Sequence, residues 1–232
     1  MSALVNYSVA DAVAAVIMDD GKRNVLSLQM FAELSGALDR AEADRVAVVL
    51  TGRAGTFSAG FDLRTLGAGG PDAYRMVRTG FELAERMLAF PAPIVVACTG
   101  DARAMGAFLL LSGDYRLGAT GAYTIQANEV AIGITMPFFG VEICRQRLTP
   151  AHFQRVVINA EAFPAEDAVH AGFLDHLVPA AELLDAARST AVALGKLPRD
   201  AHAATKLRAR AEALKAVHAA IDADDAAFRG VA

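Results

Sequence analysis

The sequence contains no tryptophan, only two cysteines and no apolar run long enough to cross a membrane. Its most apolar stretch, "AMGAFLLL" at 104–111, is much shorter than the roughly 18 residues of a membrane-spanning helix. No basic region followed by an apolar run opens the chain, so we expect no secretory signal. These absences predict a cytoplasmic protein without a membrane span.

An excess of basic residues is also missing. The chain has 22 Lys and Arg against 26 Asp and Glu, a net charge of −4, so it lacks the electrostatic footprint of a nucleic-acid-binding protein. The five histidines are scattered without ligand spacing, and we expect no metal site. Cys98 and Cys144 lie in apolar contexts without metal-like spacing, which favours buried, reduced thiols.

What the chain does have is apolar residues, 54% of its 232, enough for one large core. Apolar runs predict strands at 11–19, 45–52, 93–100, 114–119, 122–125 and 173–179. Helical spacing and turn residues predict helices at 28–38, from Pro71 to about 90, at 139–147, 150–158, 165–171 and 180–195, and one or two more beyond Pro198. The order predicts an α/β core followed by a helical C-terminal part.

Two strands end in the same way, at Thr51-Gly52 and at Thr99-Gly100, and each is followed by a loop of small residues. Glycine permits backbone angles and close approaches that a Cβ forbids. If the strands are parallel neighbours, their loops can aim two backbone N–H groups at one point, as in an oxyanion hole. Phe61 and Met105 would supply the donors. The alternative is that these are ordinary strand-to-helix connections.

Three segments carry a resemblance to a known family: "TGRAGTFSAGFDL", "ACTGDARAMGAFLLLSGDYRLG" and "ANEVAIGITMPFFGVEICRQRL". In this order they resemble the crotonase superfamily, the enoyl-CoA hydratase/isomerase family, from about Asn24 to Val178. The resemblance implies a superhelix of ββα units over 1–178, with the helical region 179–232 used in trimerisation. It also implies a homotrimer or a hexamer, a dimer of trimers.

The resemblance further implies an acyl-CoA thioester as substrate, with coenzyme A as part of the substrate and no separate cofactor. By position in the family motif, the thioester oxygen would be held by the N–H groups of Phe61 and Met105. The usual glycine triplet of the family is here Ala104-Met105-Gly106, and the Met105 side chain would narrow the acyl pocket.

Hydratases of this family use two glutamates, and the resemblance maps their positions to Phe108 and Glu129. Phe108 is an apolar ring where the first carboxylate is expected. Glu129, in "ANEVAIG", matches the second, and "NE" in place of the usual "PE" resembles the isomerase branch. Glu129 is the candidate base. Glu142 is a weaker candidate, because on a helix it can pair with Arg145.

The remaining candidates surround the first loop, where Ser58, Ala59, Gly60, Asp62, Leu63 and Arg64 are expected to line the substrate site. Asp62 can cap the next helix, and Ser58 has no His or Asp placed to activate it, so packing or loop hydrogen bonding fits it better. Lys22, Arg23 and Arg64 are candidates for the CoA phosphates or simply solvated charges. The basic run Lys206, Arg208, Arg210 and Lys215 is interpreted as the wet face of a terminal helix.

The leading hypothesis is isomerisation of a 3-enoyl-CoA to a 2-enoyl-CoA in fatty-acid metabolism. One base and an oxyanion hole suffice for it, whereas hydration needs a second group to manage a proton. The alternatives are an enoyl-CoA hydratase and a non-catalytic acyl-CoA-binding homologue.

Overall fold

The computed structural model describes residues 3–230 of the chain. The strands are β1 (Val5–Ala10), β2 (Val13–Met18), β3 (Val25–Leu26), β4 (Ala47–Thr51), β5 (Gly55–Ser58), β6 (Gly60–Phe61), β7 (Ile94–Cys98), β8 (Gly100–Arg103), β9 (Tyr115–Ala119), β10 (Thr124–Gln126), β11 (Phe163–Pro164) and β12 (His176–Val178). The α-helices are α1 (Leu28–Ala43), α2 (Leu63–Ala68), α3 (Gly70–Ala89), α4 (Met105–Leu111), α5 (Phe138–Arg145), α6 (Pro150–Val157), α7 (Ala165–Ala171), α8 (Leu183–Gly195), α9 (Arg199–Ala209) and α10 (Ala211–Gly230). Within residues 3–230 there are also two 3₁₀ turns, η1 (Val130–Ile132) and η2 (Ala180–Glu182).

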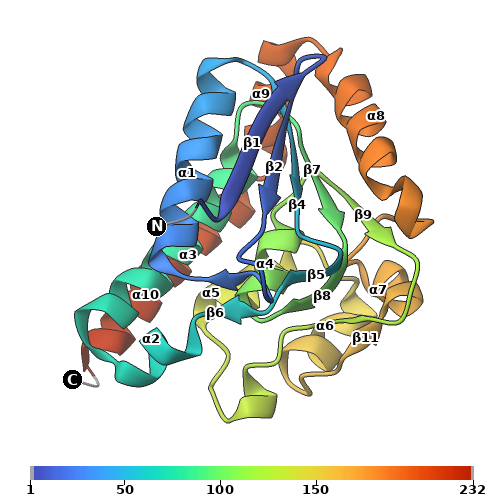
Figure 1. Cartoon of the computed structure of the whole chain (residues 1–232). Helices are drawn as coiled ribbons and strands as arrows, with labels where there is room; N and C mark the ends of the chain where they lie inside the picture. The colour runs from blue at the N-terminus through green and yellow to red at the C-terminus, as the bar shows by residue number, and fades with distance from the viewer. Residues whose placement is uncertain (1–2, 231–232) are drawn as a thin grey trace.

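The main sheet has the strand order β1-β2-β4-β7-β9-β12 and is parallel except for the antiparallel pair β1 and β2. Every residue of β4 and of β7 is buried, because helices cover both faces of this sheet. In Figure 1, α1 and α3 lie on one side of the sheet and α8 on the other. The larger core fills the first side and a smaller apolar cluster lies under α8.

The predicted strands and most predicted helices are confirmed. Ser27 caps α1, since its side chain accepts a hydrogen bond from the N–H of Met30. Asp62 caps the short helix α2, which was not predicted, by accepting from the N–H of Arg64 at 3.0 Å. The region predicted as one helix at 180–195 is the turn η2 followed by α8.

The segments after Thr51-Gly52 and Thr99-Gly100 are not loops, and that prediction is wrong. They form β5 and β8, which pair in parallel in a second sheet of order β11-β10-β8-β5. A Cβ built on Gly100 would lie 2.1 Å from the carbonyl of Gly55. The glycines therefore permit a close pairing of two strands that contain no continuous apolar run.

The C-terminal helices pack on their own chain. Helix α10 lies along α3 and α5, and its Asp224 accepts hydrogen bonds from the N–H groups of Phe138 and Phe139 at 2.9 and 2.8 Å, which caps α5. This packing was not predicted from the sequence. A role for residues 179–232 in a trimer stays a prediction.

The basic run in the tail is not uniformly solvated. Arg208 and Lys215 are exposed, whereas Lys206 is buried. The Lys206 ammonium donates to the carbonyls of Phe90 and Ala92 and pairs with Asp114 at 2.6 Å. The interpretation of this run as a solvent-exposed helix face is therefore wrong at Lys206, whose side chain connects α9 to the core through hydrogen bonds and an ion pair.

Asp114 joins three elements at this point. It accepts from the N–H of Ile94 at 2.7 Å and so holds the start of β7. Its other oxygen pairs with Arg210 at 2.9 Å. The pKa of Lys206 is lowered by burial, and the neighbouring Asp114 carboxylate only partly opposes this shift.

Among residues 3–230, no helix combines the length and apolar character needed to cross a membrane. In the same part of the chain, no three His, Cys, Asp or Glu side chains gather as a metal site would require. Cys98 and Cys144 are free, buried thiols, as predicted.

Lys206→Met should lower the free energy of unfolding by about 3 kcal/mol, because it leaves the carbonyls of Phe90 and Ala92 without this donor and Asp114 without one of its partners. The measurement is urea unfolding at pH 7. Lys215→Met, on an exposed position of α10, is the matched control and should change stability by no more than about 0.5 kcal/mol. Equal, small effects of both substitutions would contradict the anchoring role of Lys206.

Candidate functional site

Three neighbouring strands of the second sheet bring the candidate residues to one edge. β5, β8 and β10 are parallel, with β8 in the middle, so their carboxyl ends lie together. β5 leads to Phe61, β8 leads to Met105 and β10 leads to Glu129. The N–H of Ala104 bonds to the carbonyl of Gln126 at 2.9 Å, which fixes the last two strands to each other. The three candidate residues therefore follow the carboxyl ends of neighbouring strands.

The two proposed N–H donors are held close by backbone contact. A Cβ on Gly60 would lie 2.8 Å from the carbonyl oxygen of Arg103 and 3.5 Å from the backbone nitrogen of Met105. Gly60 also has φ +85°, a conformation that side chains disfavour. Because Met105 is the first residue of α4, its N–H has no acceptor within that helix.

Ala104 is strained at this point. It has φ 47° and ψ −123°, a conformation that glycine adopts more readily, and it directly precedes the proposed donor Met105. The Met105 side chain is fully buried in the main core. Its expected effect on an acyl pocket stays a prediction.

The segment before Phe61 is fixed by a buried polar network. Ser58 donates to the carbonyl of Asn24 at 2.7 Å and accepts from the N–H of Gly60 at 3.1 Å, so its role in loop hydrogen bonding is confirmed. The fully buried Asn24 in turn donates to the carbonyls of Met18 and Phe57 at 3.0 and 3.1 Å. Nothing in the sequence pattern singles out Asn24, whose φ of 51° and burial are visible only in the fold.

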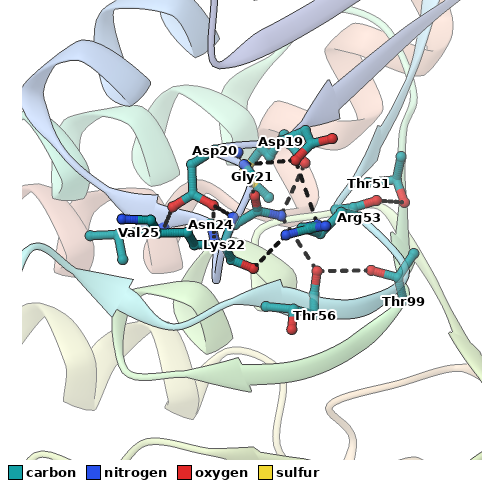
Figure 2. A network of polar contacts seen from close by, with 12 residues as sticks. Asp19, Asp20, Gly21, Lys22, Asn24, Val25, Thr51, Arg53, Thr56 and Thr99 are labelled. Carbon is teal, nitrogen blue, oxygen red and sulfur yellow. Dashed lines mark hydrogen bonds and ion pairs between the residues drawn. The ribbon is translucent and has the colours of Figure 1, made fainter.

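The same network places the turn that carries Lys22 and Arg23. Figure 2 shows Arg53 beside this turn, where it donates to the carbonyl of Lys22 at 2.9 Å and pairs with Asp19 at 3.5 Å. The carbonyl of Arg23 accepts from the N–H of Ala59 at 2.9 Å. Both basic side chains are exposed, at the border of the Ser58–Phe61 segment.

Glu129 is a buried carboxylic acid with only 7% of its surface exposed. Its Oε2 is buried without a hydrogen-bond partner among residues 3–230, as is the Oδ1 of Asn128. Burial raises the pKa of Glu129 to about 7, and a bond from its own backbone N–H opposes the rise. Burial raises the pKa of the Cys144 thiol, and the charge of Glu129 raises it further.

Phe108 lies one turn into α4 and is 1% exposed. Its ring meets that of Phe139 edge-on, with centroids 5.8 Å apart, and a Cβ on Gly140 would lie 3.0 Å from its Cζ. Phe108 is therefore packed against α5, and the position where a second carboxylate was sought is filled by an aromatic ring in the core.

The remaining candidate residues are more exposed than Met105 and Glu129 or are engaged in an ion pair. Leu63 is 68% exposed, and Arg64 is also exposed at the start of α2. Ala59 and Asp62 are half-buried. Glu142 pairs with Arg145 at 3.2 Å, as the helical spacing predicted, so this carboxylate is already engaged.

In this site, Glu129 can take up and release one proton, and two backbone N–H groups can hold an oxygen atom of a bound molecule. A carboxyl group with a pKa near 7 is divided between its acid and base forms at neutral pH, as a general acid–base requires. Two N–H groups at the adjoining strand ends can stabilise an oxygen that gains negative charge.

Comparison with known proteins agrees with this geometry. A family model described as Enoyl-CoA hydratase/isomerase matches residues 8–231. The crystal structure of an enoyl-CoA hydratase from Mycobacterium marinum is 47% identical with a TM-score of 0.93, covering 97% of this chain and 99% of that chain. The apo structure of an enoyl-CoA isomerase from Mtb (Mycobacterium tuberculosis) is also 47% identical, with a TM-score of 0.94 and the same coverage of both chains.

A more distant likeness links the chain to a human enzyme. The crystal structure of human mitochondrial delta3-delta2-enoyl-CoA isomerase is 28% identical with a TM-score of 0.91, covering 97% of this chain and 90% of that chain. These likenesses confirm the predicted crotonase-like α/β fold with a helical C-terminal part. Because the family model spans almost the whole sequence, the chain belongs to the enoyl-CoA hydratase/isomerase family of the crotonase superfamily.

Proposed function

We propose that this enzyme isomerises 3-enoyl-CoA to 2-enoyl-CoA. The observation that carries the proposal is a single buried carboxyl group, Glu129, together with an aromatic ring at Phe108, the position where hydratases of the family have a carboxylate. A double-bond shift needs one base that works twice, whereas addition of water needs two groups to manage its protons.

In the proposed mechanism, the Glu129 carboxylate removes a proton from C2, and the C2–H electron pair forms the C1=C2 bond of a dienolate. When the thioester carbonyl re-forms, this pair becomes the C2=C3 bond, and the former C3=C4 pair takes the proton back from Glu129 at C4. The thioester oxygen carries the negative charge of the dienolate and accepts hydrogen bonds from the N–H groups of Phe61 and Met105. Each such donor contributes roughly 2.7–4 kcal/mol to the transition state in related chemistry.

The burial of Glu129 supports this role. A pKa of about 7 brings the carboxylate closer to the basicity needed for a C–H proton, and the same burial keeps water away from the dienolate. Ala59, Asp62 and Leu63 would line the path of the thioester, whereas the buried Ser58 and Gly60 would hold the backbone of this segment in place. Exposed Lys22, Arg23 and Arg64 would meet the CoA phosphates.

Hydration of 2-enoyl-CoA is the competing function. Most of the similar proteins, including the one from Mycobacterium marinum, are named hydratases. The Mtb protein is named an isomerase in one structure and a probable hydratase in another, and the human relative is named an isomerase. The fate of the proton on Glu129 separates the two reactions, so both rates have to be measured. A trimer or hexamer, and a place in fatty-acid metabolism, remain proposals from the family resemblance.

Glu129→Gln should lower isomerase kcat at least about 100-fold while binding of CoA esters persists, because the amide cannot take the proton. Turnover is followed by the ultraviolet absorbance of the conjugated product, and binding by calorimetry. Glu142→Gln, the same change on a carboxylate already paired with Arg145, is the control and should retain turnover. Near-full activity of the purified Glu129→Gln enzyme would remove Glu129 from the mechanism.

Glu129→Gln should also stabilise the fold at high pH. Since burial raises the Glu129 pKa from 4.5 to about 7, the folded state binds more protons than the unfolded state between these values. The wild-type stability therefore falls as pH rises through this window, by about 3 kcal/mol in total. Urea unfolding should show the variant more stable at pH 8 and no such gain below pH ~4.5. The same gain at both pH values would refute the raised pKa.

Phe108→Glu should raise hydration relative to isomerisation, because it restores a second carboxylate and makes the site wetter. In the wild type, kcat/KM for 3-enoyl-CoA should exceed kcat/KM for hydration of 2-enoyl-CoA of equal chain length. Phe108→Leu controls for the loss of the ring without adding a charge. Faster hydration by the wild type would make the enzyme a hydratase and overturn the proposal.

A further inference from the structure

Helix α3 carries a glycine at its middle, Gly80, where helix propensity alone would disfavour it. Gly80 is buried, and its backbone is in the ordinary helical conformation, so no left-handed turn requires it. The reason for the glycine is therefore the space that a side chain would take.

That space is occupied by two aromatic rings. A Cβ on Gly80 would lie 2.7 Å from Cε1 and 3.0 Å from Cζ of Phe61, and 2.8 Å from Cζ of Phe31. Carbon atoms pack at about 3.5–4.0 Å, so a methyl group here requires a shift of roughly 1 Å. The Phe61 ring lies against the helix backbone itself.

The Phe61 ring is half-buried and also contacts two phenylalanine rings of the core. Its centroid is 5.8 Å from that of Phe31 and 6.0 Å from that of Phe81, both in edge-to-face contact. Phe31 is fully buried and Phe81 is 2% exposed. Phe81 is in turn stacked on Phe139 at 4.1 Å, so the Phe61 ring borders a packed aromatic cluster on this side.

Movement of this ring reaches the backbone of β6. The strand contains only Gly60 and Phe61 and pairs with β3, and the N–H of Asp62 bonds to the carbonyl of Leu26 at 3.3 Å. Displacing the ring by about 1 Å in a packed core therefore tilts or shifts the peptide whose N–H is the proposed donor to the thioester oxygen. A misplacement of this size can cost about 100-fold in rate.

We propose that Gly80 is a positioning residue for the oxyanion hole, acting through the Phe61 ring on the Phe61 N–H. This inference rests on the proposed function for the identity of the donor. Gly80 itself does not touch the substrate. Its role is to let the ring lie against α3, so that the Phe61 N–H points at the position of the thioester oxygen.

The test is Gly80→Ala, compared with Gly36→Ala in α1. Gly36 is also within a helix, and a Cβ there would meet nothing within 4 Å among the described residues, so it is the matched control. Gly80→Ala should lower isomerase kcat at least about tenfold with KM changed less than about threefold, the split expected when a transition-state contact is lost. Gly36→Ala should leave both unchanged.

A readout apart from turnover is the infrared carbonyl band of bound hexanoyl-CoA labelled with ¹³C at the thioester carbon, which can neither isomerise nor add water. The wild type should move this band to lower frequency on binding, and Gly80→Ala should lose at least half of the shift. In a Phe61→Leu background, where the smaller side chain leaves room, the same Gly80→Ala change should have less than a third of that effect. If Gly80→Ala alone does not fold, the two proteins of the Phe61→Leu background, with and without Gly80→Ala, are compared instead, and their band shifts should be similar.

The outcomes separate the inference from the function on which it rests. A wild-type band that does not move on binding would refute the oxyanion hole and the inference with it. A wild-type shift that Gly80→Ala leaves intact, or that it reduces equally with and without the Phe61 ring, would overturn the role of Gly80 alone.

Discussion

The site depends on a close backbone contact between β5 and β8. Gly100 lies so near Gly55 that any Cβ on Gly100 would overlap its carbonyl, and Gly60 approaches Arg103 in the same way at the other end of these strands. Such contacts are available only to glycine, and they bring two chain segments together that are more than 40 residues apart in the sequence. The positions of Phe61 and Met105 follow from this pairing.

The contact is supported from both sides rather than by its own hydrogen bonds alone. Asn24 and Ser58 tie β5 to the turn between β2 and β3, and the carbonyl of Gln126 ties Ala104 to β10. Strain at Ala104 persists because the neighbouring strands determine its position. A rigid frame of this kind suits backbone donors, since a peptide N–H can be aimed only by placing the strand that carries it.

Much of this could be predicted from the sequence, and the failures have physical causes. β4 and β7 are recognisable as continuous apolar runs because both of their faces are buried. β5 and β8 escape prediction because small residues leave little apolar signal, although the glycines that make their pairing possible are conspicuous. The anchoring of Lys206 escapes it because a lysine with helical neighbours gives no sign that three buried oxygens surround it. Glu129 is found through a motif, but its burial is a property of the fold.

The cap that Asp224 places on α5 has a consequence for synthesis of the protein. Phe139 and Asp224 are 85 residues apart, and α5 carries the ring that packs on Phe108. At a ribosomal rate of about 5–20 residues per second, the nascent chain waits about 4–17 s between the emergence of α5 and that of its capping carboxylate. During this interval the first N–H groups of α5 lack their acceptor and the wall beside Glu129 is incomplete. The strand edges that hold the candidate site can therefore assemble before α5 receives this cap.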